Sequence, residues 1–260
     1  MTHSIRSAFA RLLALVLLPL FALGGCATLT PPSAARMAAI TGPTTEQSDP
    51  WERFNRKVFA FNDAIDAAVI KPVAEAYRDV VPRWARTGVK NVLGNLSDLY
   101  SSVNLILQLK PQPAAEMGMR VATNTVFGLF GIIDVAEELG LERRSFEDFG
   151  QTLGRWGVKT GPYLVLPLIG PSNIRDGIAR LVDNQYRPAR LGWRELRDRN
   201  AVTIFDALNV RLSLLGATKL LDDIALDKYI FVRDAYLARR RSLIYDGELP
   251  EDLAPPDPTQ

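Results

Sequence analysis

The sequence predicts an all-α fold, and three observations support this prediction. Between residues 49 and 240, apolar residues recur in steps of three and four, the spacing of one helix face. Prolines and glycines separate these stretches, as they do at helix ends. Repeated apolar–polar alternation with turn residues, which would indicate strands, does not occur. With 260 residues, of which 47% are hydrophobic and 23% charged, the chain is sufficient for an ordered core.

Residues 1–25 are predicted to be a lipoprotein signal peptide. Two arginines precede an apolar run over residues 12–23, which is shorter than the roughly 20 residues of a spanning helix. The run ends in Leu-Gly-Gly-Cys, the pattern of a bacterial lipobox, and its cysteine is Cys26. The alternative is an ordinary secretory peptide beside a chance cysteine. We expect cleavage before Cys26 and acylation of its sulfur and amine. Ala27 then indicates sorting to the outer membrane.

This cleavage would restrict the chemistry of the mature chain. It removes the one histidine, and acylation consumes the one thiol, so neither a Ser-His-Asp triad nor a cysteine nucleophile can form. Zinc sites built on histidine or cysteine and structural disulfides are excluded for the same reason. Carboxylate pairs remain, but none stands apart from ordinary helix-surface charge. We therefore predict no catalytic residue, metal site or cofactor. The formal charge of +2 is too small to indicate binding to nucleic acid.

Residues 26–48 are predicted to form a flexible lipidated tether, because they are rich in Pro, Ala, Thr and Ser and lack periodicity. The helical domain is predicted over residues 49–246. Asp49 can cap its first helix, with Pro50 in the first turn and Glu52 at the third helical position.

One apolar stripe runs along this first helix. Its members are Trp51, Phe54, Val58, Phe61, Ile65 and Ala68, and Phe59 widens it. A stripe of this kind usually faces a protein core. The alternative is an aromatic-rich helix at a membrane interface, where such side chains partition well.

Further helices are predicted over 72–80, over 83–96, from Ser97 or Asp98 onward, and over 114–127. The second of these is amphipathic. Its predicted buried side carries Trp84, Val89, Val92, Leu93 and Leu96. The acidic, Pro-rich residues 247–260 are predicted to be a disordered tail.

Two segments are more apolar than a soluble amphipathic helix. Residues 162–171 are apolar and bracketed by prolines. The other segment, 126–133, includes Phe127, Gly128, Leu129, Phe130, Gly131 and Ile132. Each is too short to span a bilayer as one helix. Either could form part of the core, or a hairpin that enters the hydrocarbon region with its backbone satisfied by neighbouring protein.

These residues also carry a family resemblance. From Asp49 to Arg239, in order, the chain resembles the MlaA/VacJ family of outer-membrane lipoproteins that maintain lipid asymmetry. The matching blocks are Asp49-Pro50, Phe54-Asn55-Arg56, Phe59, Phe61-Asn62, Lys71-Pro72-Val73-Ala74, Tyr77-Arg78-Asp79, Val81-Pro82, Asn124-Thr125, Gly128, Gly131 to Val135, Phe149 to Gly154, Gly157, Gly161-Pro162-Tyr163, Leu166-Pro167, Arg175-Asp176, Asp227, Tyr229, Val232-Arg233, Ala235-Tyr236 and Arg239. The segment 182–226 aligns least, and Lys228 stands where the family pattern has proline.

The resemblance implies a single-domain helical ring, embedded in the outer membrane of a Gram-negative bacterium and anchored from the periplasmic side. An amphipathic central channel would let mislocalised phospholipids leave the outer leaflet. A soluble periplasmic carrier and trimeric porins would be the partners. Segment 126–133 would border the channel, and its glycines would permit bending or close packing. Trp51, Phe54, Phe59 and Phe61 would form the membrane-interface helix.

Arg233 is the candidate contact for a lipid phosphate, because it lies in a matching Tyr-x-x-x-Arg-x-Ala-Tyr block and a guanidinium binds phosphate oxygens in pairs. The simpler explanation is general helix-end charge. Two alternatives to lipid transport stay open. One is a scaffold lipoprotein that rests on the membrane and organises envelope partners. The other is a membrane-surface hydrolase that uses carboxylates alone.

The lipobox prediction can be tested with Cys26→Ala. Without the thiol there is no acceptor for the diacylglycerol, so we expect an unprocessed precursor that fails to complement a deletion strain. Labelling with a palmitate analogue and gel mobility measure both steps. The control is Ser33→Ala in the tether, which should be processed normally. A fully processed and functional Cys26→Ala protein would exclude the lipoprotein interpretation.

Overall fold

The computed structural model describes residues 49–186 and 195–247. These residues all belong to one compact unit, Ala34–Gln260. The predicted signal peptide, Cys26, the tether and nearly all of the predicted tail lie outside the described residues, so their assignments stay predictions.

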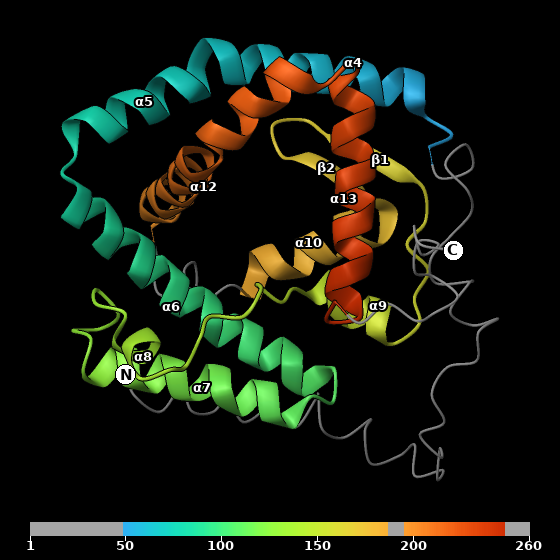
Figure 1. Ribbon diagram of the computed structural model, residues 1–260. Helices are drawn as coiled ribbons and strands as arrows, with labels where there is room; N and C mark the ends of the chain where they lie inside the picture. The colour runs from blue at the N-terminus through green and yellow to red at the C-terminus, as the bar shows by residue number, and fades with distance from the viewer. Residues whose placement is uncertain (1–48, 187–194, 248–260) are drawn as a thin grey trace, which may run out of the picture. The chain divides into compact units, whose positions relative to one another are not determined.

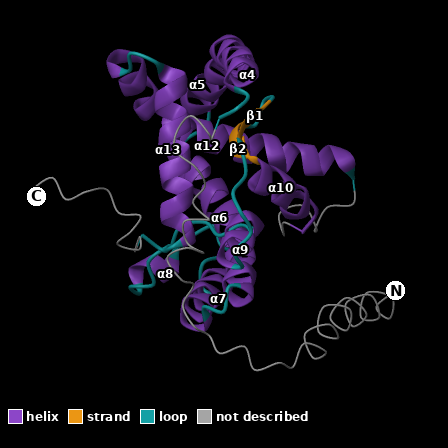
Figure 2. Ribbon diagram, turned by 90° about the vertical axis from the view of Figure 1, so that its right-hand side faces the viewer, coloured by secondary structure: helices purple, strands orange, loops and turns teal. Residues whose placement is uncertain are grey.

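The described residues are mostly helical, which confirms the predicted fold class (Figures 1 and 2). The helical elements are α4 (Glu52–Ile65), η1 (Asp66–Ile70), α5 (Lys71–Val80), α6 (Arg83–Leu107), α7 (Pro111–Val126), α8 (Val135–Glu138), α9 (Phe149–Arg155), α10 (Ile174–Tyr186), α12 (Leu196–Ile224) and α13 (Lys228–Ile244). In Figure 1, α4, α5, α6, α9 and α13 succeed one another around a circuit. A channel through this circuit of helices, and the embedding of the circuit in a membrane, stay predictions.

The first helix continues without a break from α4 through η1 into α5 (Figure 1). A proline inside a helix lacks a donor, and its ring crowds the carbonyl four residues earlier. The π-helical turn η1 lies directly before Pro72 and widens the helix where that crowding falls. The prediction that Asp49 caps α4 is wrong. The cap position is Trp51, without a side-chain bond, because the Asp49 carboxylate is bonded elsewhere.

Helix α6 also runs further than predicted. It continues through the expected break at Ser97 and Asp98 to Leu107. The Ser97 hydroxyl donates to the Leu93 carbonyl within the helix, and Asp98 is buried against α7 instead of capping a new helix. Neither side chain is therefore free to satisfy a helix start.

The Pro-bracketed segment forms a small antiparallel hairpin of β1 (Tyr163–Leu166) and β2 (Gly170–Asn173), which pairs Tyr163 with Asn173. Asn55 of α4 holds its first strand. The Asn55 amide donates to the Tyr163 carbonyl at 3.1 Å and accepts from the Val165 amide at 2.9 Å. Tyr163 and Val165 are buried, whereas the turn residues Leu168 and Ile169 are exposed. The core interpretation is therefore confirmed for the first strand, and entry of the exposed turn into a membrane stays a prediction.

Polar side chains occupy much of the interior, and many large apolar side chains lie outside. Trp84, predicted on the buried side of its helix, is 79% exposed, and Val89 is also exposed. The buried side of α6 instead carries Asn95, Asp98, Tyr100, Ser101, Ser102, Asn104 and Leu105. The helix is amphipathic as predicted, but its polar face is the one that packs against protein.

Arg120 of α7 is the largest of these buried side chains, with no exposed surface. Its Nη2 atom donates to both carboxylate oxygens of Asp134, at 2.9 and 2.8 Å, and its Nε lies 3.4 Å from Asp98. Arg143 approaches the same two carboxylates at 3.1 and 3.3 Å. Burial raises the pKa of Asp98 although both arginines oppose the shift. The cluster joins α6, α7 and the loop on either side of α8.

We expect Arg120→Leu to lower the free energy of unfolding by about 3–5 kcal/mol, because it leaves two buried carboxylates short of a partner. The control is Arg144→Gln, which breaks a more exposed 2.5 Å pair with Glu116 and should cost less than about 1 kcal/mol. Denaturant unfolding in detergent gives both values. Equal effects of the two substitutions would show that the buried cluster does not hold these elements together.

Candidate functional site

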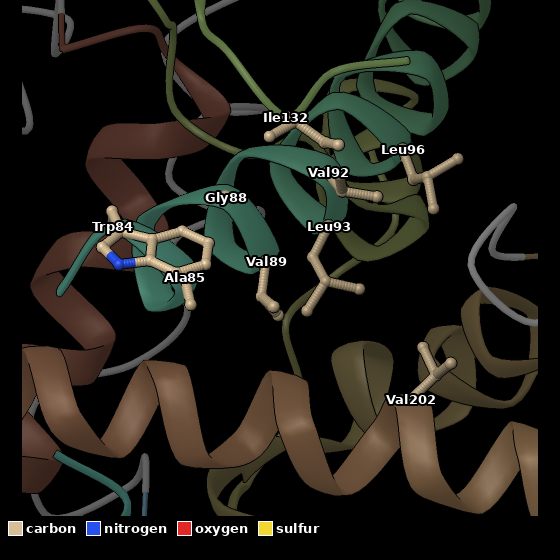
Figure 3. Close-up of a pocket in the computed structure, with 9 residues that line it drawn as sticks. All are labelled: Trp84, Ala85, Gly88, Val89, Val92, Leu93, Leu96, Ile132 and Val202. Carbon is tan, nitrogen blue, oxygen red and sulfur yellow. The ribbon is translucent and has the colours of Figure 1, made fainter. Parts of the chain in front are cut away.

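An apolar groove lies between α6 and α12 (Figure 3). Its volume is about 450 Å³. Seven of its lining residues come from α6, one from the loop between α7 and α8, and one from α12: Trp84, Ala85, Gly88, Val89, Val92, Leu93, Leu96, Ile132 and Val202. In Figure 3, Ala85, Val89 and Leu93 extend from α6 toward α12, where Val202 faces them from the opposite wall.

The chemistry of this lining selects an apolar ligand. None of the nine residues carries a charge, and Trp84 contributes the one polar side-chain atom, its indole nitrogen. The volume lies within the range of ligand sites, about 300–1,000 Å³. Such a groove binds hydrocarbon through the area it removes from water, about 25 cal/mol per Å². It offers no group that could act on an ester or phosphate.

The loop between α7 and α8 supplies Ile132 to the groove. Leu129, Phe130 and Gly131 have successive φ angles of 50°, 58° and 92°, a left-handed run that is costly for the first two residues. Asn91 of α6 holds the loop by donating to the Ile132 carbonyl at 2.9 Å. A Cβ atom at Gly131 would lie 2.9 Å from the Asn95 side chain, so the close approach requires glycine.

The same loop presents most of its apolar side chains to the outside. Phe130 is 81% exposed, and Val126, Phe127, Leu129, Ile132 and Ile133 are also exposed, while Gly128 and Gly131 are buried. The alternative in which segment 126–133 packs as core is therefore wrong for its side chains. The glycines bring the backbone close to α6, and the large residues point away. A role of the loop at a channel stays a prediction.

The predicted membrane-interface helix is divided between two environments. Trp51, Phe54 and Phe61 are exposed, so the core-facing interpretation is wrong for them. Phe59 instead packs edge-to-face on Tyr229 of α13, with ring centroids 5.7 Å apart. Asn55 is the buried residue of α4. Three of the four residues are thus placed where a membrane interface could meet them, and the fourth belongs to the interior.

Arg233 lies in a carboxylate-rich interior site. Its side chain is 6% exposed and contacts Asp234 at 2.8 Å and Asp49 at 3.5 Å, with Glu52 4.0 Å away. The Tyr229 hydroxyl donates to the same Asp49 carboxylate. A guanidinium already facing three carboxylates is poorly placed to take a phosphate. The phosphate contact is untested, but this geometry favours a structural role for Arg233.

Helix α12 is the feature that the sequence analysis missed. Its segment Arg197–Asp223 is long and apolar enough to cross a membrane by length and composition alone, and the mean hydropathy of its most apolar 18 residues is 1.2. None of its most apolar stretch is buried within the protein. The sequence signal for this helix was the high proportion of apolar residues over 202–217, a stretch that Asp206 and Arg211 interrupt. Among residues 49–186 and 195–247, no three His, Cys, Asp or Glu side chains gather as a metal site requires.

Comparison with known proteins finds similarity over most of the chain. The family model described as MlaA lipoprotein matches residues 47–243. The intermembrane phospholipid transport system lipoprotein MlaA of Escherichia coli (strain K12) is 37% identical over 206 residues, which cover 78% of this chain and 81% of that protein. The protein of the same name from Haemophilus influenzae is 32% identical over 217 residues, with coverages of 81% and 85%.

A solved structure is also similar. It comes from work on the structural basis for maintenance of bacterial outer membrane lipid asymmetry. The TM-score is 0.68 at 36% sequence identity, and the match covers 76% of this chain and 99% of that one.

The two explanations for Arg233 predict different results for Arg233→Lys and Arg233→Gln. From the contacts of Arg233 we expect the Gln variant to lose folded yield and function together, because it leaves Asp49 without its cation. The folded yield and function of Arg233→Lys should lie between those of the wild-type protein and the Gln variant. Folded yield and surface-exposed phospholipid are measured side by side, with Arg78→Gln on the surface of α5 as control. Normal yield with defective lipid asymmetry would instead support the phosphate contact.

Proposed function

Because the chain belongs to the MlaA lipoprotein family, we propose that it is a lipoprotein component of an intermembrane phospholipid transport system at the outer membrane of a Gram-negative bacterium. In this role it removes mislocalised phospholipids from the outer leaflet and passes them to a soluble periplasmic carrier, beside trimeric porins. Acyl chains on Cys26 anchor it from the periplasmic side.

The α6–α12 groove carries this proposal. A phospholipid that leaves a bilayer must keep its acyl chains out of water, at a cost of about 0.8 kcal/mol for each exposed methylene group. The groove offers an apolar wall on α6 and a facing wall on α12, with Ile132 at one side. It therefore provides shelter for an acyl chain and leaves the headgroup outside its charge-free lining.

The distribution of polar and apolar side chains supports a membrane location. Exposed apolar side chains on α4, α6, α12 and the loop after α7 would be costly in water but favourable against lipid. The ionic groups are instead paired inside. Asp176, for example, bonds to Arg240 at 2.7 Å and accepts from Tyr236 at 2.9 Å. Burial opposes its ionisation, yet Arg240 and Arg175 outweigh it and hold the pKa of Asp176 below its usual value.

The alternatives find less support. A scaffold that only rests on the membrane would use the exposed loop Phe127–Ile132 for attachment but would not need the groove. A carboxylate hydrolase would need two acidic side chains in one pocket, and the groove lining contains none. A second pocket of about 270 Å³ holds Glu147 and Asp246, but each already accepts a hydrogen bond, from Gln108 at 2.9 Å and from Lys110 at 2.8 Å. The buried carboxylates Asp98, Asp134 and Asp176 are each bonded to an arginine. They are therefore engaged in holding the fold.

Ala85→Trp tests whether the groove takes an acyl chain. The indole would fill the space between α6 and α12 and displace two or three methylene groups, which predicts roughly 10- to 50-fold weaker lipid binding. Thr87→Trp, on an exposed part of the same helix, is the matched control and should behave as wild type. Transfer of labelled phospholipid between vesicles and surface phospholipid in a complemented deletion strain are the measurements. Normal transport by folded Ala85→Trp would show that the groove does not hold the acyl chain during transport.

A further inference from the structure

Helix α12 forms one wall of the groove and has more contacts with α5 than with α6, the helix across the groove. It is 29 residues long, about 43 Å, and packs against α5 and α6. None of its described side chains is buried. An element with few buried contacts moves at low cost. The width of the groove therefore depends on whatever fixes α12 to its neighbours.

One such contact is a two-point ion pair to the first long helix. The Nε atom of Arg211 lies 2.6 Å from Oδ1 of Asp66, and its Nη2 atom lies 2.7 Å from Oδ2. The Arg211 side chain is 11% exposed, and its Nη1 donates to Thr218 one to two turns further along α12. A guanidinium bonded through two atoms and supported by a third contact fixes the orientation of α12 as well as its distance from η1. Apolar contacts alone would let α12 slide.

The partner carboxylate lies at an irregular point of its own helix. Asp66 is the first residue of η1, the π-helical turn between α4 and α5. Single π-helical turns inside α-helices occur often at functional sites. Arg211 is nine residues, about 13 Å along the axis, from Val202 in the groove wall. A shift of α12 at this ion pair would thus be carried along a rigid helix to the groove.

We propose that the Arg211–Asp66 ion pair positions α12 and so sets the width of the α6–α12 groove that receives the acyl chain. Arg211 is a positioning residue, and it does not itself contact the lipid. When the pair is intact, Val202 stays opposite Val89 and Leu93. When it breaks, α12 moves away from α6 and the groove opens. This proposal rests on the proposed function of the groove, but it makes a separate claim about the distance between α6 and α12.

The experiment uses the full lipidated protein in nanodiscs of phosphatidylethanolamine and phosphatidylglycerol. Spin labels on Lys90→Cys of α6 and Asn200→Cys of α12, both at exposed positions, report the distance across the groove by electron double resonance. We expect one narrow distribution in the protein with the ion pair. Arg211→Gln and Asp66→Asn should each broaden it and lengthen it by up to one helical turn, about 5.4 Å.

Restoration of the pair provides the decisive comparison. The double variant Asp66→Arg with Arg211→Asp should recover the narrow distribution, whereas Arg78→Gln, which breaks the exposed Arg78–Asp79 pair of α5, should not alter it. Unchanged distances in both single variants would overturn the proposal, and so would failure of the folded double variant to recover the distribution. If Arg211→Gln does not fold, Arg211→Lys and Asp66→Asn provide the same comparison.

A second readout separates this proposal from the function of the groove. A phospholipid with a photoreactive acyl chain should label α6 and α12 at the groove, and labelling should change at least about fivefold in Arg211→Gln, close to 1 kcal/mol. Absence of labelling in the wild-type protein would contradict the lipid function, while the spin-label distances would still decide the role of Arg211. Normal labelling with unchanged distances would leave the function intact and overturn the positioning role.

Discussion

The buried guanidinium of Arg120 contacts Asp98 and Asp134, and the helices α6 and α7 and the loop around α8 meet at this contact. A protein that turns large apolar side chains outward has fewer of them for its core. Its polar groups must then satisfy one another, since each unpaired buried group costs about 1–3 kcal/mol. Asn124 is an example of this pairing, because its side-chain amide donates to Asp134 and accepts from the Ala136 amide. The helices α6 and α7 and the loop beyond them therefore depend on one set of charges.

The other end of the domain follows the same principle with different residues. Asp148 and Asp176 hold Arg240 of α13 against α9 and the start of α10, and Asp49 meets Tyr229 and Arg233 of the same helix. With the interior fixed by directional bonds, the outward apolar surfaces are available for contact with lipid. The groove between α6 and α12 extends this arrangement. One of its walls, α6, is held by the buried Arg120 cluster, and the other is a helix that buries none of its described side chains.

Periodicity in the sequence predicted most helices, but it could not tell which face of a helix meets protein. The stripe of Trp84, Val89 and Val92 was placed inside because apolar stripes usually are, and only the buried Asn95 and Asp98 show the opposite orientation. Capping rules failed at Asp49 and Asp98 for a related reason, since their carboxylate oxygens accept hydrogen bonds from residues distant in the chain, Tyr229 and Arg143. The groove was not predictable because Val202 lies more than one hundred residues from the α6 residues that form the opposite wall.

The contact between Asp49 and Tyr229 spans 180 residues and joins the two ends of the described fold. Contacts this distant in sequence close last, since the entropy of closing the intervening loop must be lost before they contribute. During synthesis, Asp49 leaves the ribosome long before α13 exists. Until that final helix is complete, Asp49 lacks the Tyr229 hydroxyl and the Arg233 cation, and the hairpin residues Tyr163 and Val165 lack the Tyr229 ring that packs on them. A truncation before α13 would thus damage the first helix as well as the last.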